Sequence, residues 1–184
     1  MTDNWQAVRR IGVFCGARTG GQPQHMETAR QFGTALAGRG ASVVYGGGAV
    51  GLMGAVSGAA LAAGALVTGV VPTHLYDSED AGRSGGETVV VPSMHKRKAL
   101  MYYLSDAFAV LPGRLGTLDE LMEVATWNKL GLHRKPLVLV DPSGFRQTDG
   151  VPRRPGRPGV PESAGQVEDP DQRRCRRSAR SLAA

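Results

Sequence analysis

The chain has 184 residues, a formal net charge of +6 and 41% hydrophobic residues, which suffices for one domain with a sizeable core. It has no run of about 18 apolar residues and no basic, apolar leader, so we expect neither a membrane span nor a secretion signal. Two cysteines make no disulfide framework, which favours a reduced cytoplasmic setting.

Short apolar runs alternate with helical patterns over most of the chain. In chain order we expect a strand at Ile11–Cys15, a helix at Met26–Leu36, a strand at Ser42–Tyr45, a helix at Leu52–Ala63, strands at Leu66–Val71 and Thr88–Val91, a helix at Lys96–Leu104, a strand at Ala107–Leu111, a helix-like run at Leu118–Leu130 and a strand at Leu137–Val140.

This alternation predicts right-handed crossovers and a parallel sheet covered on both faces. The expected fold class is α/β, a Rossmann-like doubly wound parallel sheet in a single domain. Ligands of such sheets bind at the carboxyl ends of the strands. Three glycine-rich turns fall at those ends, at Gly16, Gly46–Gly48 and Gly113–Gly116.

The segment Pro112–Glu120 joins an apolar strand to a helix through a glycine-rich turn. Backbone N–H groups and the helix dipole make such a turn a phosphate-binding site. Asp119 and Glu120 do not help to bind an anion, so they indicate chemistry beside a phosphate. Both acids have a second interpretation, as helix-start acids that only favour the dipole.

The turn Tyr45–Gly54 contains five glycines. It is not the dinucleotide pattern, because no acidic residue follows about 20 positions later. Its glycines either let the backbone approach a ligand or let a helix pack tightly on a strand.

Met94–Lys98 places three cations at the start of a helix, where the dipole disfavours them. This local conflict is typical of a ligand site, and Arg97 could grip a phosphate or carboxylate. The alternative is a solvated basic face.

Cys15 follows a strand near the expected site, but without an evident base it is better explained as a small buried residue than as a nucleophile. No His/Cys/Asp cluster has metal-ligand spacing, so no metal is expected. Three of the four histidines, which are His25, His74, His95 and His133, are expected at the surface.

The composition changes after Phe145. Residues 1–145 carry 13 basic against 11 acidic side chains, a net of +2, whereas residues 146–184 carry 9 against 5, a net of +4. We therefore expect a domain at 1–145 that does not bind nucleic acid, and an Arg/Pro-rich tail at 146–184. The tail is either disordered or the product of a shifted reading frame.

Together these segments resemble the LOG ("Lonely guy") family of cytokinin riboside 5′-monophosphate phosphoribohydrolases, formerly described as possible lysine decarboxylases. The resemblance covers residues 9 to about 145. It rests on the motifs Gly12–Gly16, Tyr45–Gly48, Gly51–Gly54, Met94–Ala99, Ser105–Phe108, Pro112–Glu120 and Trp127–Gly131.

The resemblance implies hydrolysis of the N-glycosidic bond of a nucleoside 5′-monophosphate to free base and ribose 5-phosphate, as in cytokinin biosynthesis, by a homodimer that needs no cofactor. It places the family's catalytic arginine and glutamate on Arg97 and Glu120. It also implies substrate contacts from Glu79, Lys98, Gly113, Arg114, Gly116, Thr117 and Asp119.

The chain departs from the family pattern at Arg114, where the family has glycine. A non-glycine residue would cost roughly 1–2 kcal/mol there if the position needed a positive φ. Its guanidinium would either obstruct a phosphate or add a contact to it. Two alternatives therefore stay open: a catalytically impaired nucleotide-binding module, and a carrier or sensor on the same fold.

Overall fold

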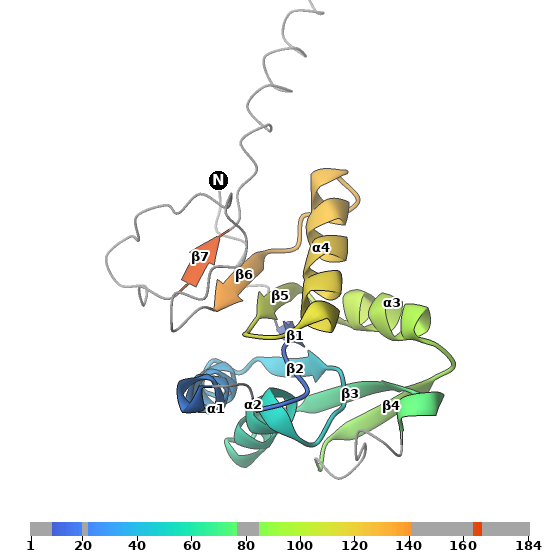
Figure 1. Cartoon of the computed structure of the whole chain (residues 1–184). Coiled ribbons are helices and arrows are strands. Elements are labelled where there is room, and N and C mark those ends of the chain that lie inside the picture. The colour runs from blue at the N-terminus through green and yellow to red at the C-terminus, as the bar shows by residue number, and fades with distance from the viewer. Residues whose placement is uncertain (1–8, 20–21, 77–84, 141–163, 167–184) are drawn as a thin grey trace, which may run out of the picture.

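The computed structural model describes residues 9–19, 22–76, 85–140 and 164–166. They form one sheet with the strand order β4-β3-β2-β1-β5-β6-β7 (Figure 1). The strands are β1 Arg10–Phe14, β2 Ser42–Tyr45, β3 Val67–Pro72, β4 Glu87–Val91, β5 Ala107–Val110, β6 Leu137–Val140 and β7 Ala164–Gln166. The first six are parallel, and β7 is antiparallel to β6. The predicted Rossmann-like α/β class is confirmed.

The helices are α1 Pro23–Gly38, α2 Gly51–Ala62, α3 Met94–Leu104 and α4 Leu115–Lys129, with a short 3-10 helix, η2, at Thr73–Leu75. Each predicted helix is present, but all four begin earlier than expected, α1 and α4 by the most. At α1 the start is Pro23, whose fixed φ suits the first helical turn. The sequence did not predict η2 or β7.

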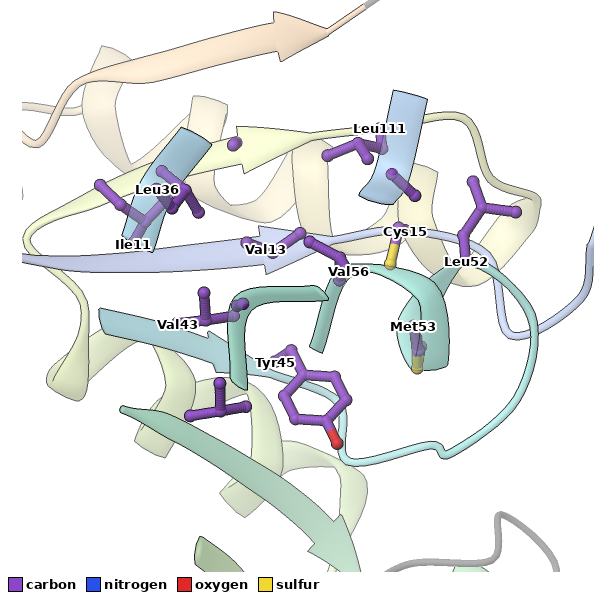
Figure 2. Close-up of a cluster of buried hydrophobic side chains, with 14 of the residues drawn as sticks. Ile11, Val13, Cys15, Leu36, Val43, Tyr45, Leu52, Met53, Val56 and Leu111 are labelled. Carbon is purple, nitrogen blue, oxygen red and sulfur yellow. The ribbon is translucent and has the colours of Figure 1, made fainter. Parts of the chain in front are cut away.

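Two apolar clusters lie on the two faces of the sheet. Figure 1 shows α1 and α2 on one side and α3 and α4 on the other. Alternate strand residues supply the two clusters: Val13 and Val43 pack with α1 and α2 (Figure 2), while Phe14 and Val44 pack with α3 and α4. This period of two explains why the strands are apolar at almost every position.

Chain order reverses at β1, whose neighbours are β2 and β5. At such a switch point the loops that follow the two central strands lead to opposite faces of the sheet. Doubly wound sheets bind their ligands in the crevice between these loops. Here the loops after β1 and β5 meet, because the Gly16 N–H donates to the Pro112 carbonyl at 3.1 Å. The candidate site therefore has a fixed place in the fold before any side chain is considered.

The histidine prediction was wrong, because His25 and His133 are both buried. His133 lies among aromatic rings below α4, 5.3 Å from the ring of Tyr102. Within the described ranges, no helix is both long and apolar enough to cross a bilayer. Of the tail at 146–184, only β7 lies inside those ranges. The prediction that the tail is disordered or frame-shifted therefore concerns residues that mostly lie outside the described ones, and Glu79 lies outside them too.

Candidate active site

Arg97 is buried in the first turns of α3, with 4% of its surface exposed. Helix α3 begins at an effective cap, since the Ser93 hydroxyl accepts from the Lys96 N–H at 3.3 Å. The Arg97 guanidinium donates from Nη2 to the Gly46 carbonyl at 2.8 Å, and Nη1 lies 3.7 Å from the Met94 sulfur. His95 and Lys96 are exposed, so only part of the basic segment is a solvated face.

The glycine-rich turn after β2 is shaped around Arg97. A Cβ on Gly46 would overlap Arg97 Nη2, and a Cβ on Gly47 would overlap Val71. Gly47 also has a φ of +82°, a conformation that other residues rarely adopt. Both glycines are therefore tightly packed, but against side chains from α3 and β3 rather than between a helix and a strand, as the alternative for this turn had it. The packing also holds the Arg97 guanidinium at the carboxyl end of β2.

The start of α4 holds the residues expected to contact a phosphate. Arg114 is its N-cap and has a φ of −112°, so the position does not need glycine and the anticipated strain is absent. Gly113 is required for a different reason, because a Cβ there would overlap the buried Thr117 side chain. Gly116 lies in the first turn of α4 rather than in the loop, and a Cβ on it would meet nothing within 4 Å.

Glu120 lies one turn further along α4, on its buried face with Thr117 and Val124. Only 9% of Glu120 is exposed. Burial raises the pKa of Glu120 to about 7, against an opposing effect of the nearby Arg97 charge. A carboxyl group with this pKa exchanges protons readily at neutral pH, as a general acid or base must.

Lys98 and Asp119, both expected to contact substrate, bind each other in the structure. Lys98 Nζ lies 3.0 Å from Asp119 Oδ2 and 3.2 Å from Glu123 Oε2. Burial lowers the pKa of Lys98, but its hydrogen bonds to Asp119 and Glu123 outweigh this and leave the pKa raised. Lys98 is therefore a fixed cation between α3 and α4.

Cys15 follows β1 and is 2% exposed (Figure 2). Burial raises the pKa of the Cys15 thiol, and the charge of Glu120 acts in the same direction. A nucleophilic cysteine needs the opposite shift, so the prediction of a small buried residue is confirmed. In the described part of the chain, no three His, Cys, Asp or Glu side chains come together as a metal site would require.

The structure thus brings Arg97, Glu120 and the start of α4 to the switch point. Sequence reasoning missed three contacts: those of Arg97 with the Gly46 carbonyl and the Met94 sulfur, and that of Lys98 with Glu123. Glu123 had a recognisable signal, because it follows Asp119 by four residues and so shares its helix face. The contact between Gly46 and Arg97 had none, because it joins residues 51 positions apart.

This fold, with a buried cation and a buried carboxyl group at the switch point, defines the class: a Rossmann-like α/β protein with a candidate polar site at the ends of its central strands. The model of a family described as "Possible lysine decarboxylase" matches residues 53–148. The chain belongs to this family, within its LOG branch.

Two plant relatives show this similarity. The cytokinin riboside 5′-monophosphate phosphoribohydrolase LOG7 of Arabidopsis thaliana is 47% identical over 145 residues, which are 79% of this chain and 67% of that protein. The probable phosphoribohydrolase LOGL1 of Oryza sativa subsp. japonica is 46% identical over 136 residues, covering 74% of this chain and 61% of that protein. The chain thus spans roughly two thirds of the length of the curated relatives it matches.

Solved structures support the fold. The molybdenum cofactor binding protein of Rippkaea orientalis has a TM-score of 0.59 and 26% identity, covering 72% of this chain and 76% of its own. The molybdenum cofactor carrier protein of Chlamydomonas reinhardtii has the same TM-score and coverage at 23% identity. The latter likeness concerns the fold alone.

The family description as a possible lysine decarboxylase does not fit Lys98, the lysine that bridges α3 and α4. A lysine that forms a Schiff base must have a lowered pKa. Lys98 has a raised pKa and is bound to two carboxylates. The chain's own residues therefore do not favour amine chemistry at this site.

Proposed function

We propose that this protein hydrolyses the N-glycosidic bond of cytokinin riboside 5′-monophosphates or similar nucleoside 5′-monophosphates. The products are the free base and ribose 5-phosphate. The observation that carries the proposal is the burial of Glu120 and Arg97 together at the switch point. The 47% identical relative, whose name states this activity, supports the same conclusion.

Glu120 is the proposed catalytic carboxylate. Breaking the bond between ribose and base develops positive charge on the sugar ring, as in glycoside hydrolysis. The ionised Glu120 would stabilise that charge or take a proton from the attacking water, whose oxygen joins the anomeric carbon. The departing base takes up a proton on the ring nitrogen that leaves the sugar. General-base help of this kind contributes ~10²–10⁴-fold to the rate.

The start of α4 is the proposed site of the 5′-phosphate. Gly113, Gly116 and Thr117 lie where free N–H groups of the first helical turn meet the dipole. Arg114, exposed at the N-cap, adds a cation there. Binding energy from the phosphate would hold the distant bond beside Glu120.

Arg97 is the proposed electrophilic partner, and it would hold the nucleotide or stabilise the departing base. Its Nη2 bond to Gly46 fixes the plane of the guanidinium before substrate arrives, and such preorganisation is a large part of electrostatic catalysis. Glu79 remains a proposed substrate contact. Lys98 and Asp119 are reassigned below to a structural role.

An impaired binding module is the alternative. It rested on Arg114, through strain or obstruction of the phosphate, and on the altered C-terminal segment; the φ of −112° removes the argument from strain. The carrier hypothesis agrees with the names of two structural neighbours, but the hydrolase relatives share far more identity with this chain. We also propose a cytoplasmic homodimer without a nucleic-acid partner.

The test is release of free base from AMP and from isopentenyladenosine monophosphate, with the unphosphorylated nucleosides as controls. We expect turnover of a monophosphate and at least ~10-fold lower kcat/KM for its nucleoside, since the phosphate contributes binding energy. Nucleotide binding without base release by the folded protein would reject the hydrolase and favour the impaired module.

A further inference from the structure

Lys98 joins the two helices that carry the proposed catalytic pair. Its Nζ contacts Asp119 at 3.0 Å and Glu123 at 3.2 Å. These two acids flank Glu120 along α4, one immediately before it and one a turn later, while Lys98 itself follows Arg97 on α3. The bridge therefore spans the pair from one helix to the other.

The bridge is a poor device for stability alone. The Asp119 side chain is 61% exposed, and exposed ion pairs contribute only ~0–1 kcal/mol. Lys98 is different, because its side chain is only 15% exposed and has a carboxylate on two sides. Its ammonium group is held in place by these two bonds, which leaves little of it to offer a phosphate.

The bridge also determines the charge around Glu120. The charged groups that act on this carboxyl are Arg97 and Lys98 from α3 and Asp119 and Glu123 from α4, while the neutral Cys15 thiol lies near it at the end of β1. The two cations favour the ionised form and the two acids disfavour it. Lys98 thus offsets the acids that it binds, and removing it would leave both of them acting on Glu120.

We propose that Lys98 is a positioning residue and not a substrate ligand: its bridge to Asp119 and Glu123 ties α4 to α3 and so holds Glu120 in place relative to Arg97. The inference rests on the proposed function and deepens it. It replaces the substrate contacts that the family resemblance implied for Lys98 and Asp119.

The test compares Lys98→Met with Lys98→Arg, which keeps the charge, and with Lys129→Met, which removes a lysine at the far end of α4. For Lys98→Met we expect kcat to fall ~10-fold or more, because small misplacements at a reacting centre are costly, with KM changed less than about threefold. The acid limb of the kcat–pH profile moves to higher pH. Lys98→Arg restores most of the rate, and Lys129→Met matches the wild type.

A second variant should move the acid limb of the kcat–pH profile in the opposite direction. The double substitution Asp119→Asn with Glu123→Gln removes both acids and leaves the lysine, so the acid limb moves to lower pH. A KM at least tenfold higher in Lys98→Met with an unchanged kcat, or no shift of the acid limb in either variant, would overturn the proposal and return Lys98 to the substrate.

The outcome stays decidable if the wild type does not turn over. The ionisation of Glu120 is then followed through the pH dependence of the free energy of unfolding, using Glu120→Gln to isolate it. The midpoint of the Glu120 ionisation should move to higher pH in Lys98→Met and to lower pH in the double variant, and such opposite shifts support the bridge. Failure of the proposed hydrolase is judged separately, from base release alone. Equal midpoints in both variants and the wild type refute the bridge.

Discussion

The Gly46 carbonyl accepts a hydrogen bond from Arg97 Nη2 at 2.8 Å, and the missing side chain of Gly46 is what leaves room for that guanidinium. A glycine on the loop after β2 thus determines where a cation from α3 lies. Because both residues are buried, neither can move without disturbing the other. The loop and the helix therefore act as one unit in building the site.

Gly46→Ala should displace Arg97 and lower kcat/KM by ~10-fold or more. The overlap should also cost ~1–3 kcal/mol of unfolding free energy, as overpacking does in a buried region. The measurements are base-release kinetics and urea denaturation. The matched control is Gly58→Ala, since Gly58 lies within α2 and its Cβ would meet nothing within 4 Å.

That control should keep wild-type activity and gain ~0.5–1 kcal/mol, because alanine is the better helix former. An active Gly46→Ala variant of unchanged stability would show that Arg97 does not depend on this glycine.

Glu120→Gln should abolish turnover and stabilise the protein above pH 7. The folded pKa of Glu120 is raised by burial from 4.5 to about 7. Its stability contribution is therefore fully present below pH 4.5 and is lost as pH rises through about 7. Glutamine removes the buried charge, so at pH 8 the variant should be more stable by up to ~3 kcal/mol, the upper bound that the shift from 4.5 to about 7 allows.

The measurement is the free energy of unfolding of both proteins between about pH 5 and pH 9, an interval that starts above the ordinary carboxyl pKa and ends near that of a thiol. Parallel curves would mean that Glu120 ionises in the folded protein as easily as in the unfolded chain.

His133 should make the protein less stable in mild acid. Its Nε2 lies 3.1 Å from the Val124 carbonyl, and its Nδ1 accepts from the Lys135 N–H at 3.1 Å, so the neutral ring is preferred. Burial lowers the pKa of His133 below its ordinary value of 6.5. The stabilisation is present above pH 6.5 and is lost as pH falls from there to the lower folded pKa.

His133→Asn keeps an acceptor for the Lys135 N–H and cannot titrate. Its unfolding free energy should decline less than that of the wild type between pH 7 and pH 5, near the histidine range. An equal decline in both proteins would assign the acid sensitivity to other groups.

Arg114→Gly should bring no gain in stability, because the N-cap already has a φ of −112° that arginine adopts without strain. Glycine loses more backbone freedom on folding, so the expected change is a loss of up to ~1 kcal/mol. We further expect a higher KM for a nucleoside monophosphate and an unchanged kcat, because a cation beside the phosphate is lost. A large rise in kcat would instead identify Arg114 as an obstruction.

The strands of the sheet could be predicted from the sequence because a strand covered on both faces is a short, continuous apolar run, as at Leu137–Val140. Sequence reasoning reached Arg97 and Glu120 through their motifs, and local conflict with the helix dipole had already marked Arg97. It could not find what depends on tertiary distance. The pairing of Lys98 with Glu123 requires α3 and α4 to lie side by side, and the φ of Arg114 depends on how the β5–α4 loop closes.

Helix ends were also less predictable than strands. Leu115 is 83% exposed, so it gave no burial signal for the first turn of α4. The burial of two histidines was not predicted, because a polar residue can lie in a core only where it finds hydrogen-bond partners, such as the Val124 carbonyl for His133. Those partners are set by the fold rather than by neighbours in sequence.

The most direct test of the central claim is a comparison of wild type and Glu120→Gln in single-turnover release of free base from isopentenyladenosine monophosphate and AMP, with nucleotide affinity measured on the same samples. The account predicts base release by the wild type and a loss of at least ~10²-fold in the variant, with affinity kept within about threefold. Equal rates in the two proteins would contradict it and remove Glu120 from the chemistry.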